Sequence, residues 1–152
     1  LVPVQHIGKG CKVIYNLPYS DRWKASGETT LTDGILGGWS YVDKKWQGTL
    51  TDLDVTVDLG CERDIHFIGA TFMHSVGAWV YVPEQVDFYV SNNGKDFKLV
   101  NTSWKDMADN YDRLSFKIYS TLCEEKARYV RLKAKKNHRD GAWLFTDEII
   151  VN

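Results

Sequence analysis

The chain has 152 residues, a net charge of −1 at neutral pH, and 43% hydrophobic and 26% charged residues. These values are typical of one globular domain with enough length for a hydrophobic core. The balanced charge gives no indication of nucleic-acid binding, and no apolar run approaches the roughly 18 residues of a membrane-spanning helix. We therefore expect a single domain over 1–152, with no nucleic-acid partner and no membrane insertion.

Aromatic residues are the outlier of the composition, because six Trp, eight Tyr and six Phe make up 13% of the chain. Trp and Tyr suit ligand-binding faces as well as cores, since their rings are rigid and their tips are polar. Three cysteines, Cys11, Cys61 and Cys123, are far apart, and no CxxC pair indicates a zinc or thioredoxin-like site. The odd number leaves at least one thiol free, and one disulfide remains possible.

In chain order, residues 1–27 are expected to form a lead-in segment and the first strand, which we place at 11–17. Further strands are expected at 52–60, 65–74, 86–91, 97–100, 114–118, 127–134 and 143–151. The alternation of apolar and polar residues over 52–60 is typical of a strand with one buried face. About eight strands at short spacing, with no convincing amphipathic helix, predict an antiparallel β-sandwich or jelly roll.

A glycine-rich and aromatic segment, 31–48, precedes the second expected strand. It begins with an acidic turn at Asp33 and continues through two glycines to Trp39, Tyr41 and Trp46. Trp39 and Tyr41 are candidates for ligand contact, whereas Trp46 is more consistent with a core anchor beneath the loop.

Several segments, in their order, indicate a family: LTDG, W-x-G, DLDVTVDLG, SNNGKDF, ARYVRLKA and DEIIV. Over roughly 28–152 this set resembles the coagulation factor V/VIII type C, or discoidin-like, domain, and above all its bacterial branch, carbohydrate-binding module family 32. The segments GGWSY, WQG and GATFMHSVGAWVYVP are similar to the C-terminal modules of Bacteroides β-N-acetylhexosaminidases, the chitobiase-like enzymes.

The resemblance implies an eight-stranded antiparallel jelly-roll β-sandwich of the galactose-binding-domain-like type. It implies a non-catalytic module that holds a glycoside hydrolase near glycans. Such a protein works outside the cytoplasm, and the expected location is therefore periplasmic, cell-surface or secreted. The expected partners are a glycan and the catalytic domain of the parent glycosidase.

The resemblance also implies a structural calcium ion, with Asp33 and Glu148 as carboxylate ligands and Leu31 and Gly38 as carbonyl donors. Calcium binds roughly six to eight oxygens, many of them backbone carbonyls, and glycine allows the backbone angles that turn carbonyls inward. The sequence ILGG stands where the family often has a further acidic or amide residue and a Thr, so fewer side-chain ligands remain. The alternative is a solvent-facing turn and a surface glutamate.

A sugar site is implied on the loops that the family uses for its ligand. The expected aromatic contacts are Trp39, Tyr41, Trp79 and Trp143, and the expected polar contacts are His74, Asn137 and His138. An aromatic ring packs on the apolar face of a pyranose, and amide or imidazole groups fix the direction of hydrogen bonds to its hydroxyls. Each residue has an alternative role, because Trp79 and Trp143 could belong to the core and His74 could pair with a backbone group. The expected ligand is a terminal galactose- or N-acetylhexosamine-type residue.

Catalysis is poorly supported by the sequence, which contains neither GxSxG nor HExxH. Asp52, Asp54 and Asp58 lie on the outward face of one expected strand, and the adjacent Asp147 and Glu148 face opposite sides. No carboxylate pair is therefore placed for glycoside hydrolysis. Two alternatives to a carbohydrate-binding module stay open. One is a discoidin-type adhesion or protein-interaction domain, and the other is a structural spacer whose loop tryptophans would be buried.

Overall fold

The computed structural model describes residues 2–152, so Leu1, the first residue of the expected lead-in segment, lies outside it. Within the described part, regular structure other than strands is limited to four short 3₁₀ turns. These are η1 (Asp21–Trp23), η2 (Gly27–Thr32), η3 (Tyr41–Asp43) and η4 (Val76–Ala78). The described residues include no helix with the length and apolar character needed to cross a membrane. The prediction of an all-β chain is confirmed.

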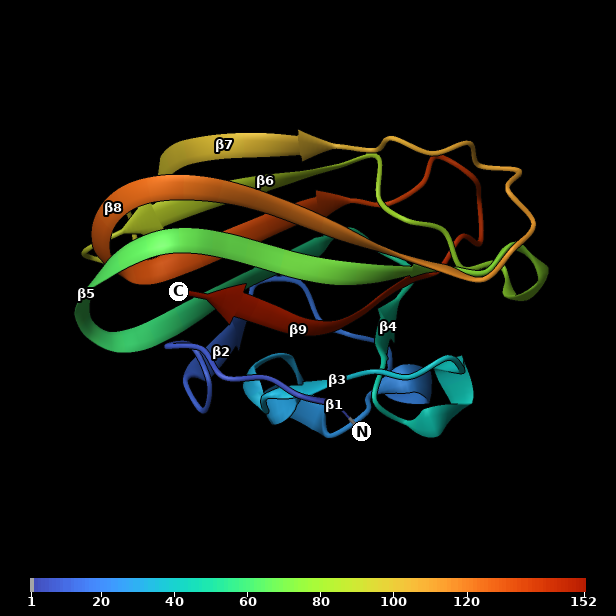
Figure 1. Ribbon diagram of the computed structural model, residues 1–152, viewed down its shortest axis with the longest axis horizontal. Coiled ribbons are helices and arrows are strands. Elements are labelled where there is room, and N and C mark those ends of the chain that lie inside the picture. The colour runs from blue at the N-terminus through green and yellow to red at the C-terminus, as the bar shows by residue number, and fades with distance from the viewer. Residues whose placement is uncertain (1) are drawn as a thin grey trace.

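Seven strands form one continuous antiparallel network, and two very short strands form a separate pair (Figure 1). The strands are β1 (Val2–Pro3), β2 (Lys12–Tyr15), β3 (Ile35–Leu36), β4 (Gln47–Thr49), β5 (Leu53–His74), β6 (Gln85–Ser91), β7 (Lys98–Trp104), β8 (Ser115–Lys135) and β9 (Leu144–Val151). The network has the order β4-β9-β5-β8-β6-β7, with β2 paired to β5, whereas β1 pairs with β3.

The long strands β5 and β8 each run through both layers of a β-sandwich (Figure 1). The first half of β5 pairs with β2 and with the second half of β8, which also pairs with β6. The second half of β5 pairs with β9 and with the first half of β8. The register shifts between Asp58 and Arg63, where Gly60 has a φ of 85°, a value that favours glycine.

The expected strands were correctly located, but the expected breaks within β5 and β8 were wrong. The segments 52–60 and 65–74 belong to one strand, and so do 114–118 and 127–134. Polar, exposed side chains at the bend interrupt the alternation and suggested a loop. Backbone pairing does not depend on those side chains, and after a gap at residues 59–62 it resumes at Arg63, which pairs with Ala127.

The main core lies between the two layers, where the inward-facing residues of 53–59 are all buried, as their alternation predicted. The outward-facing Asp54 and Asp58 each accept two hydrogen bonds from one guanidinium, Arg131 and Arg128 respectively, at 2.8 to 3.0 Å. This bidentate geometry fixes both partners across neighbouring strands.

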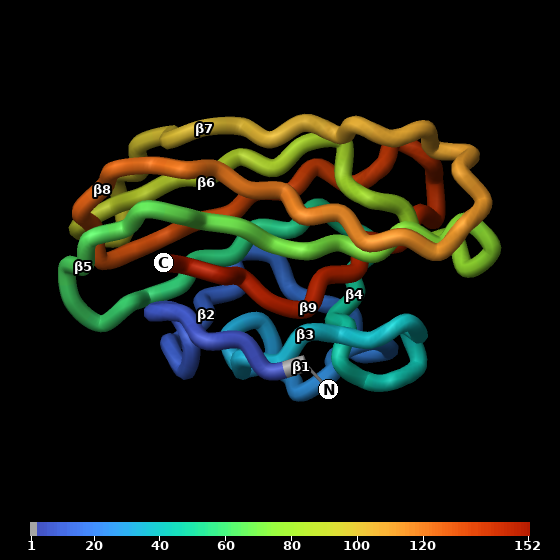
Figure 2. The backbone as a smooth tube through the Cα atoms, viewed as in Figure 1, coloured from blue at the N-terminus to red at the C-terminus, as the bar shows by residue number. Residues whose placement is uncertain are grey.

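A second hydrophobic cluster closes the end of the sandwich where the long loops gather (Figure 2). Its buried members are Trp46, Met73, Val80 and Phe145, and partly buried aromatics pack around them. Trp46 is 1% exposed and stacks on Phe116 with ring centroids 5.5 Å apart. The prediction that Trp46 anchors the core beneath the loop is confirmed.

Candidate functional site

An aromatic pocket of about 170 Å³ opens above the second hydrophobic cluster. It is lined by Arg22, Trp23, Tyr41, Ala78, Val80, Trp143 and Phe145. The turns η1, η3 and η4 and the residues at the start of β9 therefore contribute to one site. Tyr41 and Trp143 were predicted from the sequence as sugar contacts, and the structure brings them together here.

Two lining residues, Arg22 and Trp23, were not predicted. The Trp23 ring meets Tyr41 edge-on, with centroids 5.5 Å apart, and the Arg22 guanidinium lies 6.0 Å from the centre of the Trp143 ring. Ser20 caps this turn, since its hydroxyl accepts a hydrogen bond from the Arg22 N–H at 3.2 Å. The segment around Arg22 and Trp23 has no apolar periodicity. A tryptophan within a polar stretch was the only feature of the sequence that could have indicated a binding role for it.

Trp79 stands beside the pocket, next to the lining residue Ala78. Its side chain is 54% exposed, and its backbone lies in the left-handed region, with φ of 59°. That conformation is uncommon for a bulky residue and costs about 1 kcal/mol. The backbone is held by neighbours, because Trp143 N–H donates to the Trp79 carbonyl at 2.7 Å. Backbone strain at an exposed aromatic residue is a feature of ligand sites.

Trp39 is 75% exposed and meets the Phe116 ring edge-on, with centroids 5.0 Å apart. It does not line the aromatic pocket. His74 is fully buried, and its Nε2 lies 2.8 Å from the carbonyl of Tyr111. The alternative role considered for His74, pairing with a backbone group, corresponds to this contact.

The loops 105–114 and 136–143 are joined by an ionic cluster, which consists of Glu84, Lys105, Asp109, His138 and Arg139. Lys105 Nζ donates to Glu84 at 3.0 Å and to Asp109 at 2.7 Å. Arg139 donates to the other Asp109 oxygen at 2.8 Å, and His138 Nδ1 lies 3.5 Å from Glu84. Although burial would raise the pKa of Asp109, hydrogen bonds from Lys105 and Arg139 lower it to about 2.

Asn137 lies beneath the ionic cluster and is buried. Its Oδ1 accepts a hydrogen bond from the Arg139 N–H at 3.0 Å, and the Arg139 guanidinium lies 5.1 Å from the centre of the Tyr81 ring. Glu84, Asp109 and His138 could each offer an atom to a metal ion. Since Lys105 and Arg139 together balance the charges of the two carboxylates, we assign no metal here.

The turn at 33–38 is held by the two adjacent carboxylates of β9. Glu148 Oε2 accepts a hydrogen bond from Gly34 N–H at 2.9 Å, and Asp147 Oδ2 accepts one from Gly37 N–H at 2.8 Å. Glu148 Oε2 also lies 2.7 Å from His6 Nε2. The expectation that Asp147 and Glu148 face opposite sides was wrong, because both reach this turn where the register of β5 and β9 shifts between Ala70 and Phe72. Burial raises the pKa of Asp147 to about 7 and that of Glu148 to about 9.

The surroundings of Glu148 fit a cation. The carboxyl of Asp33 is close enough to Glu148 to help raise its pKa, and Glu148 Oε1 is buried without a hydrogen-bond partner among the described residues. Two neighbouring carboxyl groups and a buried free oxygen suit a hard cation such as calcium. Leu31 is buried in η2, just before this turn. The Gly38 carbonyl, in contrast, accepts a hydrogen bond from the Trp46 indole at 3.0 Å.

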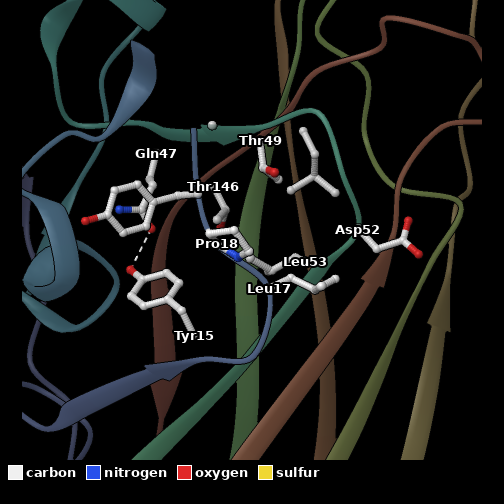
Figure 3. Close-up of a pocket in the computed structure, with 11 residues that line it drawn as sticks. Tyr15, Leu17, Pro18, Gln47, Thr49, Asp52, Leu53 and Thr146 are labelled. Atoms are coloured by element: carbon white, nitrogen blue, oxygen red, sulfur yellow. Dashed lines mark hydrogen bonds between the residues drawn. The ribbon is translucent and has the colours of Figure 1, made fainter. Parts of the chain in front are cut away.

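Another cavity lies beside β2 and β4 (Figure 3). Tyr15 donates a hydrogen bond of 2.6 Å to Gln47 in its wall. The cavity has a volume of about 10 Å³, which is close to the smallest volume that can hold one water molecule. This cavity is therefore too small for a sugar.

The fold and the pocket define a class, a discoidin-type β-sandwich with an aromatic site on its loop end. The sequence profile of the F5/8 type C domain matches residues 15–149. The chain belongs to the F5/8 type C domain family, and the resemblance to the coagulation factor V/VIII type C domain is confirmed.

Several solved structures share this fold. CpGH89CBM32-5 from Clostridium perfringens, in complex with GalNAc-β-1,3-galactose, is 19% identical over 92% of this chain and 93% of its own, with a TM-score of 0.63. The lectin domain of lectinolysin complexed with Lewis B antigen is 17% identical over 99% and 98%, with a TM-score of 0.63. Chitosan-binding module 1 of a chitosanase/glucanase from Paenibacillus sp. IK-5 is 12% identical over 97% and 98%, with a TM-score of 0.62. No curated protein matches the chain.

Proposed function

We propose that the chain is a non-catalytic carbohydrate-binding module, and that the aromatic pocket binds terminal galactose- or N-acetylhexosamine-type residues of glycans. The observation that carries this proposal is the exposed Trp79 beside a pocket walled by Tyr41 and Trp143. The apolar face of a sugar packs on such rings, and the nearby Arg22 guanidinium donates directed hydrogen bonds to hydroxyls. The complexes of similar structures with GalNAc-β-1,3-galactose and Lewis B antigen support this ligand class.

Several carboxylates of the chain are already paired with basic side chains or buried against a turn, and this supports a non-catalytic role. Asp54 and Asp58 are paired with arginines, Asp109 is paired with Lys105 and Arg139, and Asp147 and Glu148 are buried against the 33–38 turn. A glycosidase needs two carboxyl groups that reach the scissile bond from opposite sides of a cleft. None of these groups lines the aromatic pocket.

In this proposal the module is attached to a glycoside hydrolase of the β-N-acetylhexosaminidase type, in the periplasm, at the cell surface or in the secreted fraction. The similarity to a module of a chitosanase/glucanase supports such a partner. A shallow pocket gives weak binding by itself, and attachment to an enzyme raises the effective affinity for a polymeric glycan.

The proposal includes a structural calcium ion, held by Asp33, by Glu148 through Oε1, and by backbone carbonyls near the turn such as that of Leu31 in η2. We leave Gly38 out of this ligand set because its carbonyl accepts the Trp46 hydrogen bond. The ion would supply the positive charge that two neighbouring carboxylates lack, and it would fasten the turn to β9.

The test is a glycan array with the wild-type chain, followed by calorimetric titration of the best ligand. Trp79→Ala and Trp143→Ala should each weaken binding by at least about 10-fold, because each removes a stacking surface. Trp104→Ala is the matched control, since Trp104 is 67% exposed on β7 and does not line the aromatic pocket. If the wild type bound no glycan on the array, or if Trp104→Ala weakened binding equally, this site would be refuted.

A protein-interaction domain is the second candidate function. It is favoured by Ile118 and Leu122 on β8, which are 56% and 82% exposed. The spacer alternative required buried loop tryptophans, and Trp39 and Trp79 are exposed. A chain that binds no glycan on the array would favour the protein-interaction function.

A further inference from the structure

The N-terminal segment, residues 4–10, lies against the 33–38 turn and the end of β9. Val4 N–H donates to the Gly34 carbonyl at 2.8 Å, and Ile7 N–H donates to the Val151 carbonyl at 2.9 Å. His6 lies between these contacts, and its side chain is fully buried beside the equally buried side chain of Glu148. A residue 142 positions away in sequence thus contacts the carboxylate that faces Asp33.

The hydrogen bonds of His6 determine which ring nitrogen carries the proton. Nδ1 accepts hydrogen bonds from Gly8 N–H at 3.1 Å and from Val151 N–H at 3.3 Å. A nitrogen that accepts cannot carry a proton, so the proton of the neutral ring is on Nε2. This tautomer follows from the partners of the ring. His6 Nε2–H therefore donates to Glu148 Oε2 at 2.7 Å.

The same bond determines the orientation of the Glu148 carboxylate. Oε2 accepts two hydrogen bonds, from His6 and from Gly34, and is thereby saturated by nitrogen donors. Oε1 is left buried and without a protein donor among the described residues. A carboxylate held by one oxygen has only the other oxygen to offer a cation.

We propose that His6 is the positioning residue of the cation site, because its Nε2–H engages Oε2 of Glu148 and leaves the buried Oε1 to the cation. This inference rests on the calcium site proposed above and is independent of the sugar site. Its consequence is reciprocal: occupation of the site stabilises residues 4–10, and order in residues 4–10 strengthens binding of the cation. Groups that orient a metal ligand typically change metal affinity by about 10- to 100-fold when removed.

Two substitutions separate the two nitrogens of His6. The amide nitrogen of His6→Gln can reach the place of Nε2 and donate to Glu148, but nothing replaces the Nδ1 acceptor. The amide oxygen of His6→Asn can reach the place of Nδ1 and accept from Gly8, but the side chain is too short for Glu148. A purely structural role through Nδ1 therefore predicts the opposite order of tolerance from a positioning role through Nε2.

The experiment measures calcium affinity by isothermal titration calorimetry on the wild type, His6→Gln, His6→Asn and His6→Ala. We expect His6→Gln to stay within about 3-fold of the wild type, and His6→Asn and His6→Ala to lose about 10-fold or more. Equal affinity for all four chains, or a larger loss with His6→Gln than with His6→Asn, would overturn the proposal. If the wild type takes up no calcium, the cation site and this inference both fall, whereas the glycan array still decides the sugar site.

A second measurement uses the wild type alone and does not depend on how the variants fold. Amide hydrogen exchange of residues 4–10 is compared in calcium and in chelator. Slower exchange at Val4 and Ile7 with calcium supports the proposal, since both amides bond to elements next to Glu148. Unchanged exchange in this segment, with calcium bound, would overturn it.

Discussion

Two glycines determine where the large rings of the loop end can lie. A Cβ atom on Gly37 would come within 2.3 Å of the Trp46 ring, and one on Gly48 would come within 2.2 Å of the Phe145 ring. The glycines before Trp39 therefore do more than shape a turn, because one of them makes room for Trp46. The small size of Gly37 and Gly48 is a packing requirement of the second hydrophobic cluster.

Replacing Gly37 with alanine should lower the free energy of unfolding by about 1 to 3 kcal/mol, as overpacking of a fitted core does. Urea unfolding of the wild type and Gly37→Ala measures the change. Gly77→Ala is the matched control, since a Cβ there meets no atom within 4 Å. Equal destabilisation by both substitutions would show that the Trp46 contact is not the cause.

At this scale the sequence predicts a role when the residue type is informative by itself. Trp46 was assigned to the core as an anchor beneath the loop, and it is buried there. The role of His6 depends on a partner 142 residues away, and no local pattern contains that distance. Arg22 was missed for the same reason, since the aromatic ring beside it belongs to Trp143 at the other end of the chain.

At the scale of elements, the ionic cluster is what joins the loops 105–114 and 136–143. Its centre is Asp109, which receives hydrogen bonds from Lys105 in its own segment and from Arg139 in the other. The sequence placed His138 and Asn137 on the ligand-side loops but gave no partner for either. Polar loop residues follow no periodicity, and their pairing is decided only when the sandwich brings the loops together.

Acid should weaken this link. The folded-state pKa of Asp109, about 2, lies below its ordinary value of 3.8. Ionised Asp109 therefore stabilises the folded chain at pH above 3.8, and this contribution is lost as the pH falls through about 2. The difference in unfolding free energy between the wild type and Asp109→Asn should be constant above about pH 5 and shrink toward about pH 2. A difference that stays constant down to about pH 2 would contradict this assignment.

The strands show how far a pattern of alternating residues reaches. The period of two predicted the buried face of 53–59 and the outward Asp54 and Asp58, because both follow from pleating alone. It failed at the bend near Gly60, where exposed polar residues continue the strand. Beyond the bend the strand continues because it pairs with β8. The residues of β5 alone do not indicate that neighbouring strand.

For the whole molecule, the proposed cation site is the point where residues 4–10, the 33–38 turn and the last strand meet. Calcium at about 100 times its dissociation constant should stabilise the fold by about 2.7 kcal/mol. The melting temperature should then rise by about 5 to 10 °C relative to chelator. Glu148→Gln should abolish the rise, and magnesium serves as the control ion. A wild-type melting temperature indifferent to calcium would contradict the site.

The continuity of β5 and β8 through both layers has a mechanical consequence. In a sandwich of separate sheets, the layers can part along the plane between them. Here β5 and β8 each contribute one half to either layer, and they bend over together at the register shift near Gly60. Separating backbone pairs in one layer therefore pulls on the other through the fold. The scaffold yields as one piece, and the freedom to adjust around a ligand such as the proposed glycan is left to the loops at the opposite end (Figure 1).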